Sequence, residues 1–321
     1  MTSRSLLRAV VVAAASSTAQ AQDSAATTSS VGPPIRRIAT ASAVSQQTFG
    51  ALTDVQELAG NRILVNDGRR RQLLLLDTSL TLVRAVLDSV SESENTYGNR
   101  TGVLIPYRGD SALFIDPTSL ALLLIDPEGS VVRVRSVPRV QDIQYYASRM
   151  GGFGHAGTDA RGRLVYRITA RAPRPARRPP RGVPYIPPQP DSAFVVAIDL
   201  ESRKIDTLGS YRIPKSEYIV RMTPTGGYDV NTAINPIPTT DEWAVLSDGG
   251  IAFVRGIDYR IDYLNPDGSW TSAAKLPYEW QPVSDEDKTR VVDSVRTAQV
   301  RSARYSYTTA LIRWVNQYGK R

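Results

Sequence analysis

One unit recurs four times along the chain, and a repeat of this kind constrains the architecture more than any other feature of a sequence. The unit is an apolar run, an acidic or amide residue, a turn, and then an alternating run. The four copies are marked by Asp77, Asp126, Asp199 and Asn265. An Asp or Asn side chain at such a position can accept hydrogen bonds from the following backbone and start a chain reversal. Each copy is therefore predicted to be a β-hairpin.

A second strand pair precedes at least two of these hairpins. The pairs are residues 52–58 with 62–66 and residues 242–247 with 250–255, each joined by a glycine-containing turn. Four antiparallel strands per unit is the composition of a β-propeller blade. The markers are 49, 73 and 66 residues apart, whereas a plain blade takes roughly 40–45 residues. The sequence therefore predicts an all-β propeller of about four blades with insertions in the later ones; a β-sandwich of regular hairpins is the alternative.

The strand and turn spacing also resembles a known class of protein. Residues 52–77 and 243–268 resemble exported bacterial six-bladed β-propellers of the TolB- and NHL-like kind. The resemblance spans roughly residues 35 to 275, and its motifs are structural, so it implies a fold and little about activity.

The sequence departs from that class near its carboxyl end. In proteins of this kind, a helical segment such as residues 284–296 is followed by further blades that close the ring, whereas here the sequence reaches Arg321 without room for another complete blade. The resemblance thus implies an apparently shortened propeller. Its ring is smaller, stays open with the tail packed against it, or is completed by a partner.

The amino terminus carries the three parts of a secretory signal peptide. These are Arg4 and Arg8, a short apolar run over residues 9–15, and an A-x-A site over residues 19–21. The apolar run is far shorter than the roughly 20 residues that span a bilayer, and a retained membrane anchor is the alternative. Cleavage after Ala21 predicts an exported chain without a transmembrane span, located in the periplasm of a Gram-negative bacterium or secreted into the medium.

The composition excludes several classes of site. The chain has no cysteine, which rules out thiolate-bound zinc, iron–sulfur clusters and disulfides. Lys and Arg number 39 against 31 Asp and Glu, for a net charge of +8. A nucleic-acid-binding protein would interleave clustered basic residues with aromatic ones. Here the excess lies in a proline-rich insert and at the carboxyl end, so no binding of nucleic acid is predicted.

Residues 172–190 form a proline- and arginine-rich insert within the third unit. Proline cannot donate to a β-ladder, so this stretch is predicted to be an extended or irregular surface loop. The simplest interpretation is a solvated insertion. The alternative is a basic arm that contacts an anionic lipid headgroup or an acidic protein face. The candidate contact residues of that arm are Arg177, Arg178, Arg181 and Tyr185.

The carboxyl-terminal segment is predicted to begin with a helix. Ser284 is a plausible N-cap, and the acidic residues 285–287 occupy the first turn, where the helix dipole favours them. The simplest interpretation is an amphipathic tail that covers an exposed propeller edge. Its aromatic and basic residues would also suit a membrane surface or a protein partner. The candidate contact residues of the tail are Leu311, Trp314 and Tyr318.

These features give a predicted domain organisation in four parts. They are a signal peptide over residues 1–21, a linker over 22–34, a propeller domain over 35–280 and an amphipathic helical tail over 281–321.

The only histidine, His155, lies in the glycine-rich stretch of residues 151–157. That setting suggests a tight inner strand, from which the imidazole could point into a central channel. A Ser-His-Asp triad needs only one histidine, but no G-x-S-x-G elbow presents a serine. Gly152, Gly154 and Gly157 match the G-x-G-x-x-G spacing of a dinucleotide site, yet a turn and a strand follow where that site requires a helix. A structural or solvent-facing histidine is therefore predicted, with no catalytic residue and no cofactor.

The acidic residues of the repeats are interpreted as turn formers rather than metal ligands, and this applies to Asp67, Asp77, Asp116 and Asp126. An oxygen-only calcium site in a channel stays open as a possibility.

Two functions from different classes follow. The favoured one is a non-catalytic periplasmic binding or scaffolding propeller, for example an accessory subunit of a membrane-associated complex whose partners are other proteins. The alternative is a propeller hydrolase or lactonase with a channel-bound divalent cation. That enzyme needs three or four converging Asp, Glu or Asn side chains, which the sequence does not present.

Overall fold

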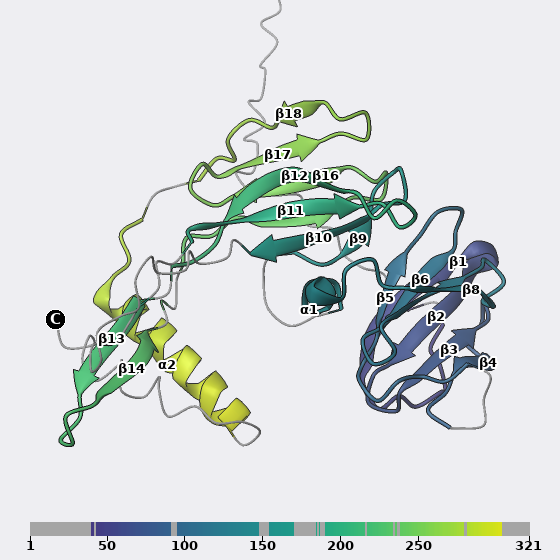
Figure 1. Ribbon diagram of the computed structural model, residues 1–321, viewed down its shortest axis with the longest axis horizontal. Helices are drawn as coiled ribbons and strands as arrows, with labels where there is room; N and C mark the ends of the chain where they lie inside the picture. The colour runs from purple at the N-terminus through teal and green to yellow at the C-terminus, as the bar shows by residue number, and fades with distance from the viewer. Residues whose placement is uncertain are drawn as a thin grey trace, which may run out of the picture. The chain divides into compact units, whose positions relative to one another are not determined.

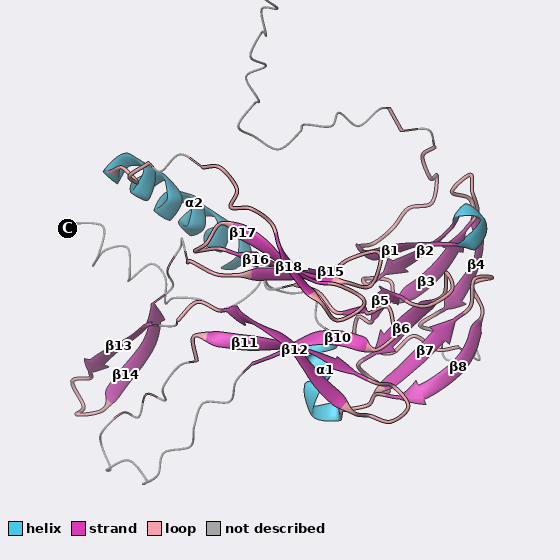
Figure 2. Cartoon of the chain, turned by 90° about the horizontal axis from the view of Figure 1, so that it is seen from above, coloured by secondary structure: helices cyan, strands magenta, loops and turns pink. Residues whose placement is uncertain are grey.

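The computed structural model of the protein describes residues 40–41, 43–90, 95–147, 154–169, 184, 186, 190–215, 217–233, 235, 238–278 and 281–303. Strands dominate this part of the chain, as Figure 2 shows by colour.

Four antiparallel sheets of four strands each form the body of the protein, and in each sheet the strands lie in chain order. We number these sheets as blades 1 to 4; Figure 1 labels the strands. Blade 1 consists of β1 (Leu52–Leu58), β2 (Arg62–Asp67), β3 (Gln72–Leu76) and β4 (Leu82–Leu87). Blade 2 consists of β5 (Val103–Pro106), β6 (Ala112–Asp116), β7 (Ala121–Ile125) and β8 (Val131–Ser136).

The other two blades repeat this up-and-down order. Blade 3 consists of β9 (Gly157–Thr158), β10 (Leu164–Thr169), β11 (Ser192–Ile198) and β12 (Ile205–Arg212). Blade 4 consists of β15 (Glu242–Val245), β16 (Ile251–Arg255), β17 (Arg260–Leu264) and β18 (Trp270–Ser272). Each predicted hairpin is therefore the outer strand pair of one blade, so the expected all-β, four-blade propeller arrangement is confirmed.

Side-chain acceptors close the hairpin turns, as the repeat predicts. One carboxylate oxygen of Asp77 accepts from the backbone N–H groups of Ser79 and Thr81, both at 2.9 Å. Asp126 and Asp199 act in the same way on their own turns. These bonds satisfy backbone donors that the reversal would otherwise leave unpaired.

A side-chain acceptor also closes the turn between β6 and β7, and in the fourth hairpin a different residue takes this role. Asp116 accepts from the Thr118 N–H at 2.8 Å, so its predicted turn role is also confirmed. In the last hairpin the carboxylate of Asp267 accepts from the Ser269 N–H at 2.8 Å. The marker Asn265 instead donates from its side-chain amide to the Ser269 hydroxyl.

Consecutive blades pack face to face through three separate apolar cores. Leu64 and Leu75 of blade 1 meet Leu104 and Phe114 of blade 2 in the first core. The second core joins blades 2 and 3, and the third joins blades 3 and 4. Each fully buried side chain of this size contributes about 1.5–3 kcal/mol. Separate cores between successive sheets distinguish this arrangement from the two-layer β-sandwich.

Two insertions lie between or within the blades. The 3-10 turn η2 (Val140–Asp142) and the short helix α1 (Ile143–Tyr146) connect blades 2 and 3. The hairpin of β13 (Glu217–Met222) and β14 (Tyr228–Ala233) forms a two-stranded sheet between blades 3 and 4. Insertions were expected in these intervals, but the sequence analysis did not recognise this second one as a hairpin.

The tail begins with a helix, α2 (Asp285–Ala303), as predicted. The Asp287 N–H donates to the Ser284 hydroxyl at 3.1 Å, and the Ser284 N–H donates back to the Asp287 carboxylate at 3.3 Å. This reciprocal pair is a capping box, so the predicted N-cap is confirmed. Within the described residues, no helix is both long and apolar enough to cross a membrane.

Candidate functional site

The ends of the first strands of blades 2, 3 and 4 line a cavity of about 620 Å³, which we call the central cavity. Successive first strands lie against each other, β1 against β5 and β5 against β9. The Thr158 hydroxyl donates to the Pro106 carbonyl at 2.7 Å and ties β9 to β5. Residues at the ends of β5, β9 and β15 then line the cavity, so blades 2, 3 and 4 all contribute to it.

The glycine-rich stretch allows the segment before β9 to approach β15 closely. Gly154 has a φ of +74°, and a Cβ there would lie 2.4 Å from the Trp243 ring. A Cβ on Gly157 would lie 2.9 Å from Val245. β9 is followed by a turn and then by β10, not by a helix. Gly154 and Gly157 therefore serve close packing of inner strands.

His155 lines this cavity and is exposed, which agrees with the predicted solvent-facing histidine near a central channel. Among the described residues, no side chain or backbone group is within hydrogen-bonding or ion-pair distance of its imidazole. The nearby acids hold turns: Asp159 accepts from the Arg161 N–H at 3.0 Å, and Asp248 accepts from the Gly250 N–H at 2.8 Å. The described part of the cavity wall thus presents a lone imidazole without an orienting carboxylate.

The cation-dependent hydrolase alternative needs converging carboxylates. Over the ranges of the chain that the structure describes, no three His, Cys, Asp or Glu side chains come close enough together to hold a metal ion.

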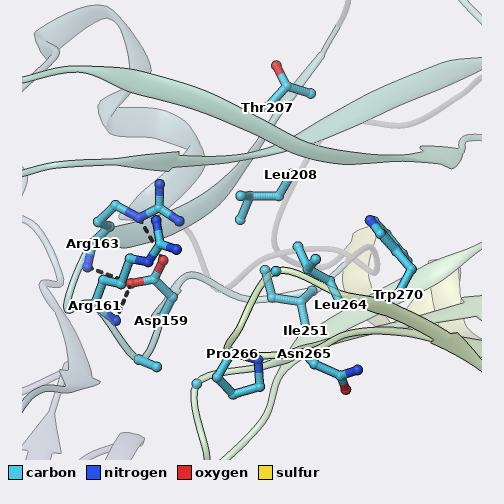
Figure 3. Close-up of a pocket in the computed structure, with 13 residues that line it drawn as sticks. Asp159, Arg161, Arg163, Thr207, Leu208, Ile251, Leu264, Asn265, Pro266 and Trp270 are labelled. Atoms are coloured by element: carbon cyan, nitrogen blue, oxygen red, sulfur yellow. Dashed lines mark hydrogen bonds and ion pairs between the residues drawn. The ribbon is translucent and has the colours of Figure 1, made fainter.

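A second cavity of about 320 Å³ lies between blades 3 and 4 (Figure 3). We call it the interblade cleft. The turn after β9 and the turn after β15 separate it from the central cavity. These turns touch, because a Cβ on Gly249 would lie only 2.1 Å from the Ala160 backbone nitrogen. Gly249 also has a φ of +81°, so both space and backbone conformation require glycine there.

The cleft has a charged end and an aromatic end. Figure 3 shows Arg161 and Arg163 beside Asp159 at one end, Trp270 at the other, and apolar side chains between them. The Asp159 carboxylate accepts from Arg163 Nε at 2.7 Å, and Arg163 Nη1 donates to Asp206 at 2.9 Å. The apolar side chains between the two ends are Leu208, Ile251 and Leu264.

Sequence analysis missed the cleft because its two ends come from different blades. Arg161 lies in the turn after β9, whereas Trp270 begins β18, more than 100 positions later along the chain. No local pattern connects them. The one available signal was a tryptophan shortly after the turn of the fourth repeat, and it is not specific.

The last blade also presents a face that belongs to none of the three cores of the described residues. Strand register places seven residues on this face of blade 4: Glu242, Ala244, Ala252, Val254, Ile261, Tyr263 and Thr271. We call this set the outer face. The alternating side chains, such as Ile251 and Phe253, point into the core shared with blade 3.

The two end blades differ in how their second faces are covered. Val254 on the outer face of blade 4 is 42% exposed, and Ile261 and Tyr263 are half-buried. On blade 1, the corresponding face carries Val65 and Leu74 on its two middle strands, which are at most 3% exposed, although Val55 on its first strand is 60% exposed. Among the described residues, the middle strands of blade 4 are therefore the less covered of the two ends, with Ala252 alone of that set buried.

The partner-binding residues predicted from the sequence fall outside the described residues. They are Arg177, Arg178, Arg181 and Tyr185 of the insert, and Leu311, Trp314 and Tyr318 of the tail. The signal peptide over residues 1–21 and the linker over 22–34 also lie outside them. These assignments stay predictions.

Together, the strand order, the three cores and the two cavities define a protein with a four-blade propeller arrangement. No family model matches the chain, and no curated protein matches it. The solved structures similar to it include virginiamycin B lyase from Staphylococcus aureus. That structure is 12% identical, with 70% of this chain and 69% of that chain covered and a TM-score of 0.31.

Two other similar structures come from different bacteria. A protein of Bacteroides fragilis named as exported is 12% identical, with 78% and 62% of the two chains covered and a TM-score of 0.40. A gluconolactonase from Xanthomonas campestris is 13% identical, with 71% and 78% covered and a TM-score of 0.30. At such low scores, the description of four blades rests on this chain's own strand pairing and cores.

Proposed function

We propose that this protein is a non-catalytic, exported binding propeller that docks a protein partner on the outer face of blade 4, as an accessory subunit of a membrane-associated complex. The observation that carries the proposal is that three apolar cores join the four blades, and of the two end faces that remain, the outer face of blade 4 is the less covered one among the described residues. The amino-terminal sequence supports export to the periplasm or beyond.

The chemistry of the outer face indicates what kind of partner fits it. Apart from Glu242 and Thr271 on its first and last strands, its residues are small or apolar. On the opposite side of the same strands, Ile251 and Phe253 already pack against another sheet. Four strands about 4.8 Å apart, each contributing about 13–16 Å of length, present roughly 250–300 Å². An apolar sheet surface from a partner protein would fit such a flat face.

Neighbouring segments extend this surface. Ile257, Tyr259, Leu276 and Tyr278 are each 45–59% exposed. The Leu276 N–H donates to the Tyr259 carbonyl at 2.8 Å, and the Tyr259 and Tyr278 rings lie 4.9 Å apart. A stable interface buries about 800 Å² on each partner. The outer face therefore supplies the centre of an interface, and these side chains supply part of its margin.

Site-specific photo-crosslinking tests the proposal in the producing bacterium. A photoreactive phenylalanine analogue is placed at Val254 in the full-length chain, and at Val134 as a control. Val134 lies on β8, is 60% exposed, and is outside the outer face. We expect one discrete adduct from position 254, recovered with the membrane fraction, and none of that size from position 134.

The outcomes separate the possible occupants. An adduct of twice the chain mass would identify a second copy in place of a different partner and would overturn the accessory-subunit assignment. The absence of any adduct specific to position 254 would overturn the docking role of the outer face.

A further inference from the structure

At the charged end of the interblade cleft, one arginine is left without a carboxylate that would neutralise it. Asp159 is neutralised by Arg163, whose guanidinium also pairs with Asp206. Lys204 lies 3.5 Å from the second oxygen of Asp206 and completes its pairing. Arg161 is exposed, and its guanidinium has no ion-pair partner among the described residues. This end of the cleft therefore carries a net positive charge that faces the cavity.

The position of the Arg161 turn is fixed by its surroundings. Asp159 accepts from the Arg161 N–H at 3.0 Å and from the Arg163 N–H at 2.8 Å. Gly162 has a φ of +69°, and a Cβ there would collide with the Arg108 side chain, which packs directly on it. The unpaired guanidinium thus projects from a turn whose backbone is held by hydrogen bonds, so the ordering entropy lost on binding is mainly that of the Arg161 side chain.

The rest of the cleft is apolar. Ile251 is 2% exposed, and Leu208 and Leu264 are half-buried at the cavity wall. Trp270 is 48% exposed, and its ring lies 5.3 Å from the Phe253 ring. A half-exposed tryptophan offers a large flat apolar surface whose burial by a ligand is favourable.

We propose that the interblade cleft binds a small amphipathic carboxylate. The carboxylate pairs with the Arg161 guanidinium, which matches a carboxylate in a two-point fork. The hydrocarbon body lies along Leu208 and Leu264 and ends against Trp270. A cavity of about 320 Å³ sets the size of the ligand. It is at the lower limit of ligand pockets, about 300 Å³, and equals roughly ten water volumes of about 30 Å³ each.

The test uses three probes that separate charge from hydrophobicity, each below its micelle-forming concentration. Decanoate has both the anion and the apolar body, decyltrimethylammonium has the body with a positive charge, and acetate has the anion alone. Binding to the full chain is followed by titration calorimetry and by tryptophan fluorescence. We expect decanoate to bind and the other two probes to bind at least tenfold more weakly.

Matched variants assign the binding to the cleft. Arg161→Gln keeps the backbone hydrogen bond of the turn and removes only the charge. We expect it to weaken decanoate binding about tenfold, which is the loss of one charge-assisted hydrogen bond of about 1.4 kcal/mol. Trp270→Phe should retain binding, and Trp270→Ala should weaken it by a similar factor. Arg100→Gln, at an exposed arginine far along the chain from the cleft, should leave it unchanged.

Three results would overturn the proposal. One is the absence of decanoate binding at millimolar concentration to a chain that is folded by circular dichroism. Another is equal affinity for the anionic and cationic probes, which would indicate nonspecific hydrophobic contact. The third is equal affinity of the Arg161→Gln and Arg100→Gln variants for decanoate.

Discussion

A buried hydrogen-bond network joins blades 1 and 2, and Tyr97 is its central member. The Tyr97 hydroxyl donates to Asn66 Oδ1 and accepts from the Gly102 N–H, both at 2.9 Å. The Asn66 amide in turn donates to the Asp54 carboxylate and to the Gly102 carbonyl, also at 2.9 Å. Tyr97 is 2% exposed and Asn66 is fully buried. Tyr97→Phe would remove both hydroxyl bonds while keeping the ring.

The loss of stability expected for Tyr97→Phe follows from the two polar groups that would lose their hydrogen-bond partner. The Gly102 N–H and Asn66 Oδ1 would each lose a hydrogen bond in a buried position, at about 1–3 kcal/mol apiece. The ring contact with Phe114, at 5.0 Å between centroids, is retained. Allowing for partial relaxation, we expect the free energy of unfolding to fall by about 2–4 kcal/mol. At roughly 2–4 °C per kcal/mol for a domain of this size, the melting temperature falls by about 4–16 °C.

Urea unfolding followed by circular dichroism measures this change. Tyr228→Phe is the matched control, because Tyr228 is 38% exposed and its hydroxyl has no hydrogen-bond partner among the described residues. The control should stay within about 0.5 kcal/mol of the parent protein. A loss of less than 0.5 kcal/mol for Tyr97→Phe would refute the argument that this network holds blades 1 and 2 together.

The same residue predicts a dependence on alkaline pH. Burial raises the pKa of Tyr97 to about 12, against an ordinary value of 10.0. Because the folded-state pKa is raised, the corresponding stability is present below pH 10 and is lost as the pH rises from about 10 to about 12. We expect the parent protein to lose stability across that window and Tyr97→Phe to lose less. Tyr146 and Tyr166 also have pKa values raised by burial, so part of the slope should persist.

Three further predictions concern other parts of the fold. Gly249→Ala should lower the melting temperature more than Gly226→Ala, because both glycines have positive φ but only Gly249 contacts another turn. Gly226→Ala should lower the free energy of unfolding only by the cost of the left-handed backbone conformation, about 1–2 kcal/mol. Burial alone would raise the pKa of Asp262, but hydrogen bonds led by that from Arg255 hold it below its ordinary value. Its contribution is therefore present above pH 4 and lost as the pH falls through the folded pKa, so Asp262→Asn should lower stability by about 2 kcal/mol at pH 7 and by progressively less as the pH falls below 4. His155→Gln should leave stability and photo-crosslinking unchanged; loss of either would show that the imidazole has a role the fold does not reveal.

The outer hairpins of the blades could be predicted because their determinants are local. Asp77 and Asp126 each bond to backbone groups within four residues. The apolar runs before them are the buried middle strands, such as β3, in which Leu73 to Leu76 are all at most 2% exposed. A turn-forming acid after a run of this kind specifies a hairpin without any long-range information.

The inner strands and the extra hairpin were harder to predict for different physical reasons. β9 is only two residues long, pairs with β10 over two residue pairs, and is tied to β5 by a bond between residues 52 positions apart. The β13–β14 hairpin does have a local signal, a turn at residues 223–227 between two alternating runs. That turn does not fit the spacing of the repeat, so the sequence indicated only an insertion at this place and not a hairpin.

If the outer face of blade 4 docks a partner as proposed, a single strand encodes both an internal contact and a docking surface. In β16, Ile251 and Phe253 point toward blade 3, while Ala252 and Val254 point away from it. The inward positions hold large side chains that are at most 2% exposed, and the outward ones hold smaller side chains. At about 25 cal/mol per Å², small side chains limit the cost of leaving that face in water, and they also limit the energy gained when it is covered. A face of this composition suits a partner that dissociates more readily than a blade of the same chain could, which is the behaviour expected of an accessory subunit.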